Sequence, residues 1–119
     1  MFNLFSRGAG KSRMTAAQAV ETRDRVLLLD VRDAGEIRQS GKAEGAICIP
    51  LTVLGFRADP RHPEFDRRLD PQATICVYCA AGGRAGSAQR MLEGLGYTNV
   101  HAIGGLRDWV AAGGKVERG

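Results

Sequence analysis

Residues 74–85 read TICVYCAAGGRA and carry the strongest structural signal in this 119-residue chain. The apolar run 74–78 predicts a buried strand, and a helical run begins at Ala85. A glycine-rich turn that starts with Cys79 lies between them. The Cys79 thiol is therefore expected at the C-terminal end of a strand, opposite the N-terminus of a helix. Open α/β sheets bind their ligands at that edge.

Such a turn favours the reactive form of a thiol. Consecutive backbone N–H groups form a concave anion site, and the dipole of the following helix adds positive potential. Both effects favour the thiolate, which is the nucleophilic form of cysteine. Glycines in the turn allow positive φ, and an arginine adds a permanent cation. The candidate nucleophile is therefore Cys79, and the candidate substrate-binding residues are Ala80, Ala81, Gly82, Gly83 and Arg84.

The rest of the chain alternates between strand and helix patterns. Strands are expected at residues 26–30, 45–50, 74–78 and 100–103, and helices at 15–21, 33–39, 85–95 and 106–112. Residues 51–70 are expected to be irregular, with a short helix around 64–69. Alternation at this spacing predicts an α/β fold with a parallel sheet covered by helices on both faces.

Composition indicates one ordinary globular domain. We interpret residues 1–13 as a flexible basic arm and residues 14–119 as the domain. The formal net charge is +4, but the basic residues of 57–68 alternate with acidic ones and lack an aromatic stacking platform, so no nucleic-acid partner is expected. No apolar stretch approaches membrane-spanning length, and the apolar start is too short for a secretory signal. We therefore expect no membrane partner and a cytoplasmic location.

The other cysteines do not suggest a second site. Cys76 and Cys79 have the spacing of redox or zinc pairs, but three residues of extended chain separate their Cα atoms by roughly 10 Å, beyond disulfide reach. Zinc would need further ligands, and His62 and His101 are not paired at metal spacing. We expect Cys48 and Cys76 to be small buried apolar residues, and we expect no metal and no cofactor.

Five segments, in order, resemble the rhodanese-like sulfurtransferase family. They are Leu29-Asp30-Val31-Arg32 with Glu36, Gly41 through Gly45 to Pro50, Val77-Tyr78-Cys79 with Gly82 and Arg84, Gly94-Leu95-Gly96-Tyr97, and Gly104-Gly105 through Trp109. The resemblance implies a five-stranded, mostly parallel sheet with helices on both faces, and a six-residue loop whose first residue, Cys79, carries a persulfide.

The same resemblance implies transfer of sulfane sulfur. The donor is thiosulfate or a thiol or protein persulfide, and the acceptor is a thiol, cyanide or a protein. Two departures from the family pattern stand out. The stretch 41–45 lacks the usual His-Ile before its last glycine, and positions 80 and 81 are alanines where members that favour thiosulfate often carry a cation.

Other readings of the same residues stay open. Cysteine-dependent phosphatases and arsenate reductases need five residues between cysteine and arginine, whereas only four separate Cys79 from Arg84. A non-catalytic interaction or sulfur-carrier module with the same fold is a further alternative. Arg84 is expected to act on loop and substrate electrostatics, or else to pair with an acid such as Asp30. Asp30 and Arg32 are expected to form a structural ion pair.

Overall fold

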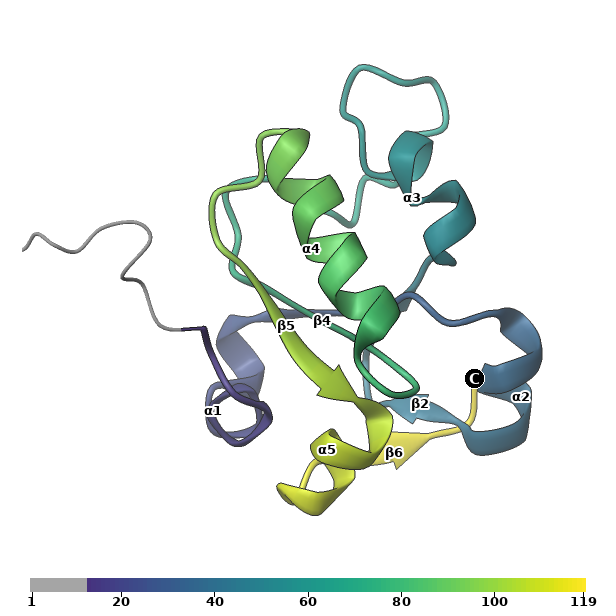
Figure 1. Ribbon diagram of the computed structural model, residues 1–119, viewed down its shortest axis with the longest axis vertical. Helices are drawn as coiled ribbons and strands as arrows, with labels where there is room; N and C mark the ends of the chain where they lie inside the picture. The colour runs from purple at the N-terminus through teal and green to yellow at the C-terminus, as the bar shows by residue number, and fades with distance from the viewer. Residues whose placement is uncertain (1–12) are drawn as a thin grey trace, which may run out of the picture.

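The computed structural model describes residues 13–119 and has an α/β architecture (Figure 1). A parallel four-stranded sheet has the order β3-β1-β4-β5, and a short antiparallel pair joins β2 to β6. The helices are α1 (Ala16–Glu21), α2 (Ala34–Ser40), α3 (Leu51–Arg57), α4 (Gly83–Gly94) and α5 (Leu106–Ala111). The strands are β1 (Leu27–Asp30), β2 (Lys42–Ala43), β3 (Ile47–Cys48), β4 (Ile75–Cys79), β5 (Val100–Gly105) and β6 (Val116–Glu117).

The sheet separates two apolar clusters. One cluster joins Leu54 of α3 and Leu92 of α4 to side chains of β1 and β4. The other joins Ala19 of α1 and Trp109 of α5 to the opposite face. β4 is buried at all five positions, as expected for a central parallel strand that is covered on both faces. The predicted α/β fold with a covered parallel sheet is confirmed.

Two details of the predicted fold differ from the structure. The parallel sheet has four strands and not five, because β2 pairs with β6 in a separate antiparallel ribbon. The helix between β3 and β4 lies at Leu51–Arg57, directly after Pro50, and not at 64–69, where the chain forms turns. Leu54 anchors that helix in the core, so tertiary burial decides its position.

The predicted N-terminal arm lies almost wholly outside the described residues, since only Arg13 of residues 1–13 is described. Arg13 contacts the body of the domain, because its Nη1 donates to the carbonyl oxygen of Val100 at 3.2 Å. Within residues 13–119, no helix is both long enough and apolar enough to cross a membrane. A cytoplasmic location stays a prediction.

Candidate active site

Cys79 is the last residue of β4 and is 1 % exposed. α4 begins four residues later at Gly83, so the thiol lies between a strand end and a helix N-terminus, as the sequence predicts. The pairing of β4 with β5 is irregular between Val77 and Cys79, where the register shifts. Irregularities of this kind occur next to functional sites, because they redirect a side chain at a strand end.

Two backbone N–H groups point at the Cys79 sulfur. The amide nitrogen of Gly82 lies 2.9 Å from Sγ, and that of Ala85 lies 3.4 Å from it. Gly82 has φ +111°, a conformation that favours glycine and that turns its N–H inward. Ala85, in the first turn of α4, is a donor that the sequence analysis did not include. Together these donors form a partial cage for a negatively charged sulfur.

The loop packs tightly against the start of α5. A side chain at Gly105 would overlap the carbonyl oxygen of Ala80, so this position requires glycine. The N–H of Gly105 is held by the carboxylate of Asp108 at 2.7 Å, which fixes the backbone that supports the loop. Ala80 and Ala81 are exposed to solvent, and we call the surface around these two residues the mouth of the loop.

Arg84 pairs with Glu36 of α2. Its two Nη atoms each lie 2.8 Å from one carboxylate oxygen of Glu36, in the bidentate geometry typical of strong pairs. Both side chains are about one-third exposed, at 36 % and 34 %. Hydrogen bonds from Arg84 and from the backbone N–H of Asp33 lower the pKa of Glu36 to about 2. The pairing partner is thus Glu36 and not Asp30, the acid that the sequence analysis named.

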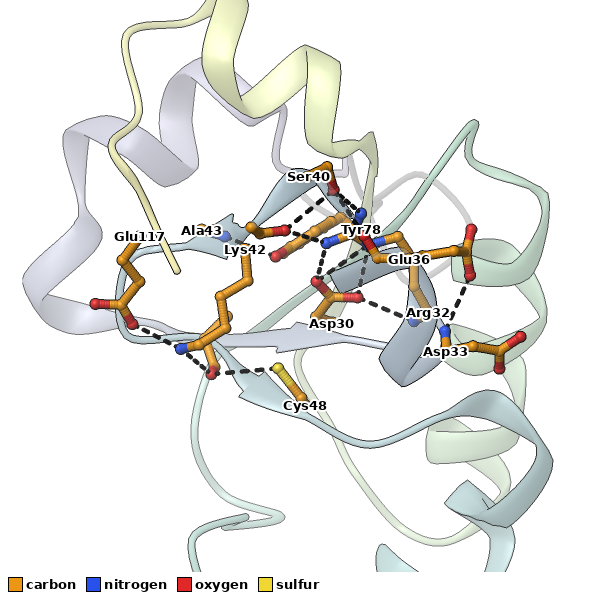
Figure 2. Close-up of polar contacts among 12 residues, drawn as sticks. Asp30, Arg32, Asp33, Glu36, Ser40, Lys42, Ala43, Cys48, Tyr78 and Glu117 are labelled. Carbon is orange, nitrogen blue, oxygen red and sulfur yellow. Dashed lines mark hydrogen bonds and ion pairs between the residues drawn. The ribbon is translucent and has the colours of Figure 1, made fainter. Parts of the chain in front are cut away.

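Asp30 instead binds Arg32 in a buried network (Figure 2). Nη2 of Arg32 lies 2.8 Å from Asp30 Oδ2, and the backbone N–H of Arg32 also donates to this carboxylate at 2.9 Å. The guanidinium further donates to Ser40 Oγ and to the carbonyl oxygen of Gly41, both at 2.7 Å. Tyr78 lies beneath it, with its ring centroid 5.8 Å from the guanidinium carbon. The predicted structural ion pair is therefore present.

A hollow of about 290 Å³ lies beside the loop mouth. Its lining residues come from the end of β1, α2, the loop and α5: Arg32, Glu36, Gln39, Ser40, Ala80 and Leu106. A larger hollow of about 590 Å³ lies between α1 and α5 and is lined by no loop residue. The smaller hollow borders the Cys79 loop through Ala80, so a substrate bound there can be presented to the loop.

The other cysteines lie outside this site. Cys76 is fully buried in the cluster on the opposite face of the sheet, where burial raises the pKa of its thiol to about 11. Cys48 is half-buried, and in Figure 2 it lies beside Lys42 and Asp30. All three cysteines are free thiols. Cys76 is buried as predicted, whereas Cys48 is only partly so.

The fold and the loop define a class of α/β domains that present a cysteine in a tight loop between a parallel strand and a helix. The family model of the rhodanese-like domain matches residues 13–112. The chain therefore belongs to the rhodanese-like domain family.

The chain is also similar in sequence to two individual proteins. Thiosulfate sulfurtransferase PspE of Escherichia coli K12 is 38% identical over 80 residues, which are 67% of this chain and 70% of the relative. Thiosulfate:glutathione sulfurtransferase of Saccharomyces cerevisiae is 30% identical over 103 residues, which cover 75% of this chain and 68% of the relative. Both relatives are named as sulfurtransferases.

Solved structures match over nearly the full length. A protein of unknown function from Rhodopseudomonas palustris, described as a possible tyrosine phosphatase, has a TM-score of 0.78 at 27% identity and covers 98% of this chain and 99% of its own. A rhodanese-related protein from Thermoplasma volcanium has a TM-score of 0.74 at 27% identity, over 92% of this chain and 100% of its own.

Proposed function

We propose that this protein moves sulfane sulfur from a small donor to a thiol or cyanide acceptor through a persulfide on Cys79. The class of the enzyme is a rhodanese-type sulfurtransferase, in keeping with the family and with the names of the relatives. The observation that carries the proposal is the pair of N–H groups, from Gly82 and Ala85, directed at the Cys79 sulfur.

The chemistry has two displacement steps. In the first, the Cys79 thiolate attacks the outer sulfur of the donor, a new S–S bond forms to Sγ, and the donor's own bond to that sulfur breaks with its electron pair. Thiosulfate then leaves as sulfite, and an alkyl persulfide leaves as the thiolate. In the second, an acceptor nucleophile attacks the terminal sulfur and Cys79 leaves as the thiolate. Fixed N–H donors near the sulfur favour each anionic state without reorganisation.

The direct test is mass spectrometry of the protein after incubation with thiosulfate or with an alkyl persulfide. Wild type is expected to gain one sulfur atom, mapped to the peptide that contains Cys79, and to lose it when cyanide is added. Cys79→Ser should gain none and should lose sulfur transfer. Cys76→Ser is the matched control and should retain most of the activity, with a modest loss of stability. Equal loss of activity in a folded Cys76→Ser protein would contradict a single-cysteine mechanism.

A phosphatase reaction is the second candidate, since the Rhodopseudomonas palustris protein is described as a possible tyrosine phosphatase. Only four residues separate Cys79 from Arg84, and both Nη atoms of Arg84 are bound to the carboxylate of Glu36. We therefore expect no hydrolysis of an aryl phosphate. Hydrolysis that disappears in Cys79→Ser would overturn this expectation.

A further inference from the structure

The charged side chain of the Cys79 loop belongs to one ion pair. Arg84 is the only charged residue in the loop 79–84, and both of its Nη atoms are bound to the carboxylate of Glu36. Hydrogen bonding to Glu36 raises the pKa of Arg84 further above its ordinary value, and the charges of Glu36, Cys79 and Asp33 add smaller contributions. The guanidinium is thus bound by the Glu36 carboxylate, and the pair adds no net charge to the mouth.

The hollow beside the mouth offers little further positive charge. Arg32 lies in its lining but is 3 % exposed, and its guanidinium is taken up by Asp30, Ser40 and Gly41. Besides Arg32 and Glu36, the lining consists of the polar Gln39 and Ser40 and the apolar Ala80 and Leu106. Such a surface suits an uncharged organic group that can make a few hydrogen bonds.

Donors of sulfane sulfur differ sharply in the charge that they bring to this mouth. Thiosulfate arrives as a dianion and leaves as the sulfite dianion, so two negative charges stay beside the loop throughout the step. An alkyl persulfide on a carrier without net charge, R–S–SH, yields Cys79–S–SH and R–S⁻, which takes a proton from solvent. A carboxylate that lines the hollow beside the mouth opposes the first reaction more strongly than the second.

We propose that Glu36 selects the donor: by neutralising Arg84 it makes the site favour alkyl persulfides on uncharged carriers over dianionic thiosulfate. This rests on the proposed transfer of sulfur through Cys79. Glu36 acts through Arg84 and the local charge, so it is a specificity-determining residue and takes no part in bond making.

The test is Glu36→Gln. The amide keeps the shape of the side chain, and its oxygen still accepts from Arg84 and from the N–H of Asp33, which Glu36 now binds at 3.0 Å. The net charge at the mouth rises by one. We expect kcat/KM for thiosulfate to rise about 3- to 10-fold at low salt. The gain should shrink as salt is added, and kcat/KM for cysteine persulfide should change less than about twofold.

Glu64→Gln is the matched control, because it makes the same charge change on an exposed residue. Residue 64 lies in the segment between α3 and β4, which Figure 1 draws as a teal loop above α3. This control should alter kcat/KM for neither donor.

A competition experiment measures the same preference without steady-state kinetics. Wild type and Glu36→Gln are each mixed with equal concentrations of cysteine persulfide and thiosulfate whose outer sulfur is ³⁴S, and the isotope on the Cys79 peptide is measured by mass spectrometry. Wild type should carry mainly the light isotope, and the variant should carry more ³⁴S. Wild type that carries mainly ³⁴S would overturn the inference even if the variant does not fold.

The remaining outcomes separate the two proposals. If Glu36→Gln loses activity equally with both donors, Glu36 only holds the loop in shape, and the inference is wrong while sulfur transfer stands. An equal gain with both donors would overturn it as well. If wild type gains no sulfur from either donor, the proposed function fails and the inference fails with it.

Discussion

Two arginine–carboxylate pairs lie at the carboxyl edge of the same sheet, and they differ mainly in their contact with water. The side chains of Asp30 and Arg32 are 0 % and 4 % exposed, whereas those of Glu36 and Arg84 are each about one-third exposed. Both pairs are bidentate in form. Within residues 13–119, the buried pair makes further hydrogen bonds to backbone and side-chain groups, while the exposed pair makes one further hydrogen bond, from the backbone N–H of Asp33.

The difference in solvent exposure indicates that the buried pair stabilises the fold, whereas the exposed pair is placed to affect the choice of donor. A buried carboxylate without its partner is strongly unfavourable, so the Asp30–Arg32 pair ties β1 to the start of β2. An exposed pair contributes little to stability, because water already solvates both charges. The Glu36–Arg84 pair therefore has freedom to affect the local charge next to Cys79 at small cost to the fold.

Removing Arg32 should produce the largest effect. In Arg32→Met, Asp30 stays buried without a counter-charge, and Gly41 loses the donor to its carbonyl oxygen. We expect a loss of about 3–5 kcal/mol in the free energy of unfolding, measured by urea denaturation. A loss below about 1 kcal/mol would show that the buried pair has no more structural importance than an exposed one.

Removing Arg84 should lower the activity with thiosulfate strongly and the stability only slightly. Arg84→Met should cost at most about 1 kcal/mol of stability, since the pair is partly solvated. It leaves the Glu36 carboxylate uncompensated at the mouth, so kcat/KM for thiosulfate should fall about tenfold or more, and that for cysteine persulfide by less. Arg90→Met, an exposed position on the same helix, is the control. Equal losses with both donors would mean that Arg84 supports the loop and not its charge.

Adding an unpaired cation should have a smaller effect of the opposite sign. Ala80 is exposed at the mouth, and Ala80→Arg should raise kcat/KM for thiosulfate a few-fold to about tenfold, with the gain shrinking as salt is raised. Gln72→Arg, exposed near the opposite end of β4, is the charge-matched control. If Ala80→Arg gives no gain, a cation from elsewhere already reaches the mouth.

Arg57 and Arg61 are poor sources for such a cation. Arg57 contacts Asp66 at 3.3 Å, and Arg61 contacts Asp59 at 3.1 Å. Both partners lie in the loop that follows α3, so each guanidinium is already paired within its own segment.

Lowering the pH from 8 to 5 should have the smallest effect on the preference between donors. The pKa of Glu36 is lowered from 4.5 to about 2, so its pairing stabilises the fold fully above pH 4.5 and this contribution is lost as the pH falls through about 2. The preference between donors should therefore not change through protonation of Glu36 between pH 8 and pH 5. Carboxyl carbon NMR of Glu36 measures the titration directly, and a midpoint near 4.5 would contradict a persistent pair.

The sequence predicts much of the local structure around Cys79. The apolar strand, the glycine turn and the helix start are contiguous, so local propensity and the burial pattern determine them together. The buried pair is also local, because Asp30 and Arg32 are only two residues apart. Short-range patterns of this kind can be recognised in the sequence without knowledge of the tertiary fold.

The exposed pair could not be identified in this way. Glu36 and Arg84 are 48 residues apart, and only the parallel order of β1 and β4 brings α2 beside the start of α4. One signal was available, since Asp33 and Glu36 form a capping box that places Glu36 in the first turn after β1. The pairing of β2 with β6 involves two residues on each strand, too few for a pattern to show.

The alternation of side chains along β4 bears on how long a sulfur atom would stay on Cys79. Cys76 and Tyr78 face one side of β4, and the register of β4 with β1 and of β1 with β3 places Cys48 on that side also. Cys79 alone faces the other side, so the sheet itself stands between it and both of the remaining thiols. A persulfide formed there has no neighbouring thiol to discharge it into an internal disulfide. We expect the lifetime of such a persulfide to be governed by encounters with outside acceptors.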